Sequence, residues 1–196
     1  MVMFVTVFKK ILSLLIVPFA LLMMAGGAYL VIVATYPQLT PPSAKEPRTT
    51  TDSNPTARTT PTLFIPKIDI EIPFSSSGIE ALDNGAWWRS PDSGNPKDGG
   101  NFVLAAHRFQ MGWTPAQTAR QSPLYHIDKL QRNDTILVDY EGIRYEYVIT
   151  DIRQVEPNAT EIEQPTSDDR LTLYSCTLGG TYDGREVVVA HKVSEK

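Results

Sequence analysis

The chain has 196 residues, which is enough for one ordinary domain of about 100 to 150 residues and one additional segment. Its 22 acidic and 18 basic residues give a formal net charge of −4. The sequence has no basic patch or stripe of the kind that binds nucleic acid, so we expect no nucleic-acid partner. A single cysteine excludes an internal disulfide, the commonest reason for an extracellular domain to contain cysteine.

The N-terminal segment predicts one membrane-spanning helix over residues 11–34. These 24 residues carry no charge, and at a rise of 1.5 Å per residue they are long enough to cross a ~30 Å hydrocarbon core. A cleaved signal peptide is the alternative, but its apolar region spans only about 7 to 15 residues. Lys9 and Lys10 lie directly before the span, which predicts a cytoplasmic segment at residues 1–10 and an extracellular location for the rest of the chain.

Residues 35–61 form a segment rich in Pro, Thr and Ser with almost no apolar side chain to bury. Such a segment cannot offset the entropy cost of ordering its backbone, so we expect an extracellular linker. Pro-rich chain is extended and semi-rigid, and a stalk of this length is expected to hold the next domain several tens of Å from the bilayer. A flexible connector without a length requirement is equally compatible with these residues.

The remaining domain, residues 62–196, is predicted to be all-β. Short apolar runs rich in β-branched residues alternate with turn signals such as Asp-Gly, Glu-Gly and Gly-Gly. Only the short stretch SPLYHIDKL, residues 122–130, has a helical pattern. About seven strands with little helix indicate a sandwich or a closed barrel, and the pattern does not decide between them. The predicted strand segments are residues 62–74, 101–107, 135–140, 144–155, 170–176 and 185–193.

Cys176 ends one of these runs, LTLYSC, and is followed by a glycine-rich loop. A lone cysteine can be a buried small hydrophobe, a thiol that pairs between chains, or a nucleophile. The place of Cys176 at the end of a strand favours a position near solvent, where a rigid scaffold presents functional side chains. Arg185 opens the next strand, and a hairpin would bring it beside Cys176. A guanidinium there favours the thiolate and can stabilise an oxyanion.

A nucleophilic cysteine also needs a proton shuttle, and the sequence has three histidines. His107 ends the apolar run NFVLAAH and is therefore expected at a strand end, like Cys176. His126 lies in the short helical stretch and is expected to be a surface or capping residue. His191 shares a strand face with Arg185 but lies about 20 Å along it at ~3.3 Å per residue. His107 is therefore the candidate general acid/base.

These residues resemble the sortases, cysteine transpeptidases of the bacterial cell surface. The family motif is Thr-Leu-x-Thr-Cys followed by an arginine-bearing strand, and this chain has LTLYSC followed by GR before a valine-rich strand. FIPKIDIEIPF resembles the opening strand of the family, and ALDNGAWWRSPDSGNPKDGGNFVLAAHRF resembles the segment that leads to its histidine. PLYHIDKLQRNDTILVDYEGIRYEYVITDIRQVEP resembles the strands that follow. The resemblance covers residues 63–193 in order, behind a membrane anchor.

The resemblance implies a closed eight-stranded β-barrel with short helices and a two-step acyl transfer. Cys176 would be the nucleophile, His107 the general acid/base, and Arg185 the residue that binds substrate and stabilises the oxyanion. The implied substrates are secreted proteins with a Leu-Pro-x-Thr-Gly-like C-terminal sorting signal. The implied acceptor is an amine of a peptidoglycan precursor or a pilin lysine. The chain would be a single-pass cell-membrane protein of a Gram-positive bacterium with an extracellular catalytic domain.

The chain departs from the family pattern at two positions next to these residues. Ser175 stands where threonine is usual, and Ala106 stands where glycine is usual, so both are candidate substrate-binding positions. The stretch MGWTPAQTARQ, residues 111–121, resembles an added loop without an assigned role. No cofactor is expected, and calcium activation is left open. The acidic residues Glu161, Glu163, Asp168 and Asp169 are interpreted as a solvated loop face rather than a metal site.

Three alternatives come from other classes. The first is a catalytically silent sortase-like domain that serves in adhesion or scaffolding, although the joint presence of Cys176, His107 and Arg185 argues against it. The second is an L,D-transpeptidase, whose Ser-His-Gly-Cys pattern is absent before Cys176. A metal-dependent enzyme is the weakest alternative, because one cysteine and three scattered histidines do not have zinc-site spacing.

Overall fold

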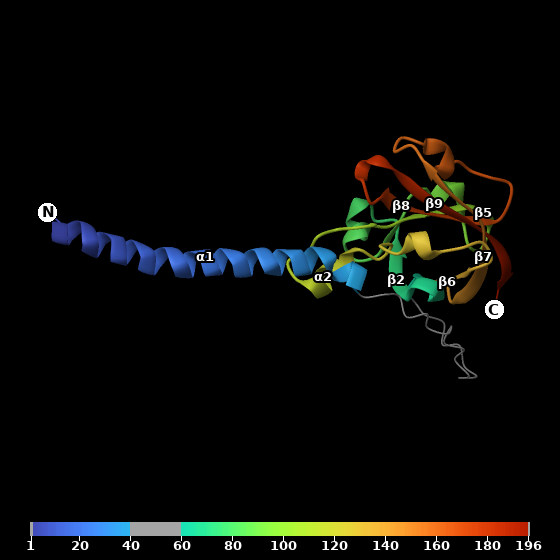
Figure 1. Cartoon of the computed structure of the whole chain (residues 1–196). Helices are drawn as coiled ribbons and strands as arrows, with labels where there is room; N and C mark the ends of the chain where they lie inside the picture. The colour runs from blue at the N-terminus through green and yellow to red at the C-terminus, as the bar shows by residue number, and fades with distance from the viewer. Residues whose placement is uncertain (1, 40–59, 196) are drawn as a thin grey trace.

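The computed structural model describes residues 2–39 and 60–195, and it consists of one long helix joined to a β-barrel (Figure 1). The helix α1 (Val2–Leu39) contains the predicted span 11–34 and continues beyond it. Its segment Leu14–Leu39 is long and apolar enough to cross a membrane. Residues 35–39, which we expected in the linker, are therefore helical. Residues 40–59 of the expected linker lie outside the described residues.

The barrel follows in a chain of short strands, 3-10 helices and one further α-helix. The strands are β1 (Thr62–Ile65), β2 (Ile70–Ser75), β3 (Ala86–Trp88), β4 (Gly94–Asn95), β5 (Gly99–Ala105), β6 (Thr135–Tyr140), β7 (Ile143–Val155), β8 (Arg170–Thr177) and β9 (Gly180–Glu195). The helical elements are α2 (Pro115–Gln121), η1 (Pro66–Ile68), η2 (Ile79–Asp83), η3 (Pro91–Ser93), η4 (Ile127–Lys129) and η5 (Thr160–Glu163).

The sheet closes on itself. The strand order is β3-β2-β1-β6-β7-β9-β8-β5-β4, and an additional antiparallel pairing of β3 with β5 joins the two ends. Eight strands therefore form the closed barrel, and the two-residue β4 pairs only with β5. The predicted all-β barrel is confirmed, and the sandwich that the pattern left open is excluded.

Local chemistry explains where strands break. The predicted opening strand, residues 62–74, is in fact two antiparallel strands, because Pro66 starts a 3-10 turn and Asp69 adopts φ of 52°. Glu141 and Gly142 join β6 to β7 with φ of 49° and 81°. Two successive residues with positive φ are typical of the type I′ turn, which matches the twist of a hairpin.

Two apolar clusters lie on opposite faces of the sheet. The larger one fills the barrel with side chains such as Phe102, Leu104, Leu173 and Val188. Because side chains alternate along a strand, the residues between them point outward. These outward residues form a second cluster, which Ile162 of η5 covers: Val103, Ala105, Tyr174, Val187 and Val189.

The predicted helix at residues 122–130 is wrong in position. The α-helix in this region is α2 (Pro115–Gln121), and residues 122–130 form turns and the short η4. Thr114 caps α2, because its hydroxyl accepts a hydrogen bond from Gln117 N at 3.2 Å, and Pro115 occupies the first turn. The sequence Thr-Pro-Ala-Gln is a helix-start signal that explains this position.

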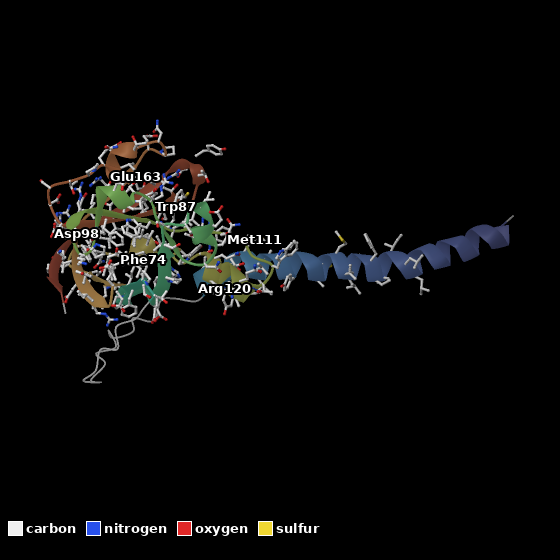
Figure 2. The ribbon with its side chains drawn as sticks, turned by 180° about the vertical axis from the view of Figure 1, so that it is seen from behind. Phe74, Trp87, Asp98, Met111, Arg120 and Glu163 are labelled. Atoms are coloured by element: carbon white, nitrogen blue, oxygen red, sulfur yellow. The ribbon has the colours of Figure 1, made fainter. Side chains whose placement is uncertain are left out.

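The barrel contacts the long helix directly. Figure 2 shows Met111 and Arg120 beside the C-terminal part of α1, and Asp98 at the far end of the barrel. Tyr29 donates a hydrogen bond to Trp113 O at 2.8 Å, and the ring of His126 bonds to Pro37 O at 2.9 Å. Val33 is 1% exposed. The expected separation of several tens of Å between membrane helix and domain is therefore not seen.

Candidate active site

Three neighbouring strands bring Cys176, His107 and Arg185 to one end of the barrel. The antiparallel register of β8 and β9 places Cys176 opposite Arg185, which confirms the expected hairpin pairing. On the other side, β8 runs parallel to β5 with Ala105 opposite Tyr174, and Ala106 N donates to Tyr174 O at 3.1 Å. His107 and Cys176 each follow that pair by two residues.

Cys176 and Arg185 lie on one face of the sheet, and His107 lies two residues beyond the end of β5. Positions 103 and 105 of β5 share this face with 172, 174 and 176 of β8 and with 185, 187 and 189 of β9. The outward cluster beneath η5 occupies the middle of this face. The candidate site lies on the same face, next to this cluster and at the end of β8, where Cys176 is half-buried and carries a free thiol.

The imidazole of His107 is half-buried beside this end. Burial lowers the pKa of His107 below its ordinary value of 6.5, and the negative charge of Asp83 opposes the shift. Among residues 2–39 and 60–195, none forms a hydrogen bond with the ring of His107. Its backbone is fixed instead, since Leu124 N donates to His107 O at 3.1 Å. The lowered pKa favours the neutral imidazole, the form that can accept a proton.

The guanidinium of Arg185 is held by the turn that precedes it. Its Nη1 donates to Thr181 O at 2.9 Å and to Gly184 O at 3.0 Å. Both bonds use Nη1, so the N–H groups of Nη2 and Nε are not needed to hold this conformation. An open hollow lies beside the β8–β9 turn, and its lining residues are Gln154, Val155, Glu156, Thr177, Asp183 and Gly184. Thr177 and Gly184 are the chain neighbours of Cys176 and Arg185, which do not themselves line the hollow.

A buried ion pair supports the site from inside the barrel, and the sequence analysis missed it. Arg108, 4% exposed, follows His107, and its Nη1 donates to Glu186 at 2.7 Å. Its Nη2 donates to Asp128 at 2.9 Å. Glu186 follows Arg185, so the pair connects the two strands that flank β8. The sequence did contain a signal for this pair, because a charged residue directly follows each of two candidate site residues: Arg108 follows His107, and Glu186 follows Arg185.

Residues 63–193 match the family model described as a sortase domain. The chain belongs to the sortase family. It is 26% identical over 136 residues to sortase A of Bacillus anthracis, an alignment that covers 68% of this chain and 60% of that relative. The match therefore spans less than two thirds of the relative's length.

Solved structures share the fold of this sortase. Sortase A of Listeria monocytogenes superposes with a TM-score of 0.59 at 20% identity, covering 70% of this chain and 88% of that one. Sortase E1 of Streptomyces coelicolor, solved with a tripeptide in its active site, has a TM-score of 0.58 at 24% identity, covering 70% and 89%. A sortase D5 transpeptidase of Clostridium perfringens has a TM-score of 0.56 at 23% identity, covering 69% and 79%.

The two positions where this sortase departs from the family pattern point into the barrel. Ser175 is 2% exposed and its hydroxyl donates to Cys176 O at 3.0 Å. Ala106 is 4% exposed and belongs to the inner core. Both residues, which we expected to be substrate-binding positions, are therefore buried behind the face that carries Cys176.

The segment before β8 is anchored by Glu163, which we had interpreted as part of a solvated face. Glu163 accepts hydrogen bonds from Arg89 Nε at 3.0 Å and from Tyr174 Oη at 2.5 Å. Burial acts to raise the pKa of Glu163, but these hydrogen bonds outweigh it and the pKa is lowered. Burial and the bond to Glu163 raise the pKa of Tyr174. The Glu163 interpretation was wrong because this side chain is paired and half-buried.

Asp168 and Asp169 are also paired, with His191 at 2.7 Å and with Lys192 at 3.1 Å. In the described part of the chain, no three His, Cys, Asp or Glu side chains are placed to hold a metal ion.

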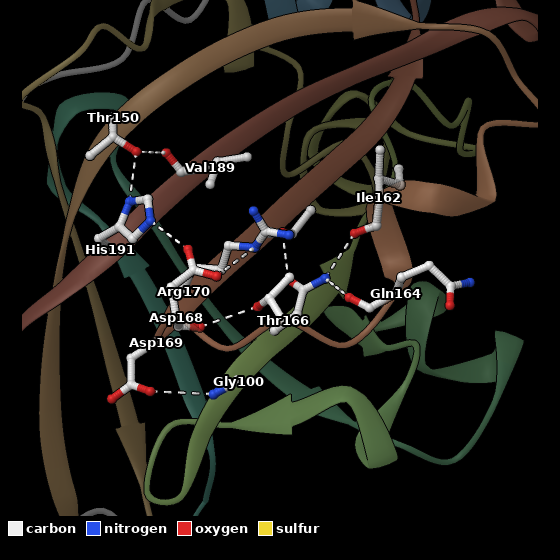
Figure 3. A network of polar contacts seen from close by, with 12 residues as sticks. Gly100, Thr150, Ile162, Gln164, Thr166, Asp168, Asp169, Arg170, Val189 and His191 are labelled. Atoms are coloured by element: carbon white, nitrogen blue, oxygen red, sulfur yellow. Dashed lines mark hydrogen bonds and ion pairs between the residues drawn. The ribbon is translucent and has the colours of Figure 1, made fainter.

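The other two histidines are committed elsewhere. His191 lies opposite Arg170 at the start of β8, at the other end from Cys176. Both ring nitrogens of His191 are bonded, to Asp168 at 2.7 Å and to Thr150 at 2.8 Å (Figure 3). His126 occupies the N-cap position of η4, in line with the expected capping place, and its half-buried ring bonds to Pro37 O of α1.

Proposed function

We propose that this sortase is a membrane-anchored cysteine transpeptidase in which Cys176, His107 and Arg185 form the catalytic site. The proposal depends most on one observation: the register places Cys176 opposite Arg185, while the parallel neighbouring strand β5 ends at Ala105, two residues before His107. The sortase D5 relative is described as a transpeptidase, and the sortase E1 relative holds a tripeptide, which supports a peptide substrate.

In the first step, Sγ of Cys176 attacks the Thr–Gly carbonyl carbon of a Leu-Pro-x-Thr-Gly-like sorting signal. The S–C bond forms, the C–N bond breaks, and His107 delivers the thiol proton to the departing glycine amine. Arg185 donates hydrogen bonds to the carbonyl oxygen while it carries negative charge. The neutral imidazole of His107 fits this role because it can take the thiol proton before giving it to the amine.

In the second step, an incoming amine attacks the thioester. The new C–N bond forms as the S–C bond breaks, and the proton lost by the amine returns through His107 to the thiol. The amine belongs to a peptidoglycan precursor or to a pilin lysine. No cofactor takes part in either step. Ser175 and Ala106 act in this scheme by fixing the strands behind Cys176 and His107.

We further propose that α1 spans the cell membrane once, with residues 1–10 in the cytoplasm and the barrel outside. Lys9 and Lys10 before the apolar span favour this orientation. Substrates that carry their own membrane segment would then meet the enzyme in the same plane, at a raised effective concentration.

The test uses the full chain in detergent micelles and its Cys176→Ala variant. Each is incubated with a fluorogenic Leu-Pro-Glu-Thr-Gly peptide, with and without triglycine and with and without calcium, and the products are weighed by mass spectrometry. We expect a triglycine adduct of the Leu-Pro-Glu-Thr fragment that the variant does not form. A folded wild-type protein that forms neither adduct nor cleavage product across a panel of sorting-signal peptides would instead support a silent binding module.

A further inference from the structure

The exposed part of α1 is long enough to cross a bilayer core. Among the side chains that the structure describes, those of residues 14–32 are exposed, whereas those of residues 33–37 are half-buried or buried. These 19 residues extend about 28 Å at 1.5 Å per residue, close to a hydrocarbon core of ~30 Å. A membrane that covers this length of α1 has its outer boundary near Ile32, directly beside the barrel.

The loop after His107 lies at this boundary. Trp113 O accepts the hydrogen bond from Tyr29, so the backbone of Trp113 is fixed three residues before the end of the exposed length. The packing of Val33 and the bond between His126 and Pro37 hold the next turns of α1 against the same part of the barrel. The loop therefore lies at the depth where a bilayer passes from hydrocarbon to headgroups.

Three large apolar side chains of this loop are exposed. Trp113 is 86% exposed, Met111 44% and Phe109 39%. Apolar side chains that gather on one exposed surface mark an interaction site, and tryptophan is enriched at the membrane–water interface. In the β8–β9 turn, which follows Cys176, Leu178 is 60% exposed and Tyr182 95%.

The segment after His107 differs in charge from the opposite end of the barrel. Residues 109–127 contain no Asp or Glu, although the chain has 22 acidic residues, and Arg120 lies among them. At the opposite end, Lys97 pairs with Glu141 at 3.0 Å and Lys192 with Asp169 at 3.1 Å. An apolar surface without negative charge suits a lipid headgroup layer, whereas a surface rich in ion pairs suits water.

We propose that Phe109, Met111 and Trp113 form a membrane-contact surface that seats the active-site end of the barrel in the outer headgroup layer. This inference rests on the proposed membrane span of α1. The seated barrel holds Cys176 close to the bilayer, so the enzyme acts on peptide bonds near the point where a substrate leaves the membrane. The loop after His107, which had no role in the sequence analysis, is then the element that sets this height.

The test uses the full chain in nanodiscs of neutral and anionic phospholipids. In the Cys176→Ala background, a nitroxide is attached to single cysteines introduced as Met111→Cys, Trp113→Cys, Lys97→Cys or Leu22→Cys. Collision rates with oxygen, which concentrates in lipid, and with a water-soluble nickel chelate give the depth of each label. Thermal unfolding in the nanodisc verifies that each variant is folded.

We expect the labels at 111 and 113 to collide with the nickel chelate several-fold less often than the label at 97, and the label at 22 to be the least accessible of all. If the labels at 111 and 113 collide with the nickel chelate as often as the label at 97, while the label at 22 is inaccessible, the seating is overturned and the span is left intact. A label at 22 in water would overturn the span itself, and the seating with it. Neither result would alter the transpeptidation test.

A Met111→Ser/Trp113→Ser double variant gives a second test. The double variant should keep its rate on a soluble sorting-signal peptide and lose about tenfold on the same peptide fused to a transmembrane helix, because the effective concentration falls. If the double variant and the wild type act on the tethered peptide at equal rates, the result would count against the seating.

Discussion

Each end of the barrel has a histidine beside polar groups, but the two imidazole rings differ in their hydrogen bonds. His191, at the charged end, has both ring nitrogens bonded, to Asp168 and to Thr150. His107, at the end that contacts α1, is half-buried and its backbone is fixed, yet no described residue bonds to its ring. A ring with both nitrogens bonded stabilises structure, whereas a ring held only by its backbone can exchange protons with a ligand.

The first prediction compares these two histidines directly. His107→Ala should lower kcat/KM for transpeptidation by about 10² to 10⁴-fold, because the proton shuttle is lost. His191→Ala should leave the rate nearly unchanged and lower the free energy of unfolding by about 1 kcal/mol per lost hydrogen bond. Steady-state kinetics and urea unfolding measure the two effects. If His107→Ala and His191→Ala lose activity equally, the two histidines do not differ in their catalytic role.

The second prediction concerns the ion pair inside the active-site end. Arg108→Met leaves Glu186 without its partner, and such a loss costs about 3 kcal/mol in a buried pair. Arg132→Met is the control, because Arg132 is exposed and its pair with Asp151 should contribute less than about 1 kcal/mol. Urea unfolding compares both variants with the wild type. A loss no greater in Arg108→Met than in the control would remove this support from the site.

The third prediction concerns the segment that covers the outward face. Glu163→Gln should lower the free energy of unfolding at pH 7 by about 1 to 3 kcal/mol, since charged hydrogen bonds to Arg89 and Tyr174 are weakened. The pKa of Glu163 is lowered in the folded state, so this stabilisation is complete above its ordinary value of 4.5. It disappears as the pH falls through the lower folded value.

The difference in the free energy of unfolding between wild type and Glu163→Gln should therefore be much larger at pH 7 than at pH 3. Unfolding curves at the two pH values measure it. Glu161→Gln, an exposed position in the same turn, is the matched control. A difference that grows toward low pH would contradict the assigned direction of the shift.

The smallest expected effect is on the titration of His107. Burial lowers its pKa and Asp83 partly offsets that, so Asp83→Asn should lower the pKa further. The imidazole signals of His107 in NMR measure this in the wild type and in the Asp83→Asn variant. A rise in the pKa of His107 would show that Asp83 does not act on it through its negative charge.

Much of the barrel was predictable because its strands follow local rules. Alternating apolar residues and turn signals located the strands around residues 101–107, 135–140 and 170–176 close to their observed bounds. The same reasoning put Cys176 and Arg185 on paired strands. Barrel closure was not predictable from the pattern, since it depends on the pairing of β3 with β5 across the whole sheet.

The remaining errors come from tertiary contacts. The helix α1 extends past residue 34 where it packs on the barrel, and no local signal in the Pro-rich sequence reveals that contact. Glu163 looked like a solvated acid because Arg89 and Tyr174 are distant in sequence. The position of α2 was a different kind of error, because its start signal at Thr114 was present and was not used.

The most direct test of the proposed chemistry is the mass of the enzyme during turnover. The full chain is mixed with a Leu-Pro-Glu-Thr-Gly peptide, quenched in acid within the steady state, and weighed intact, and the modified residue is located by peptide mapping. We predict an increase equal to the Leu-Pro-Glu-Thr acyl group, carried by Cys176 and removed on addition of triglycine. Turnover without such an adduct, or an adduct on another residue, would contradict covalent catalysis through Cys176.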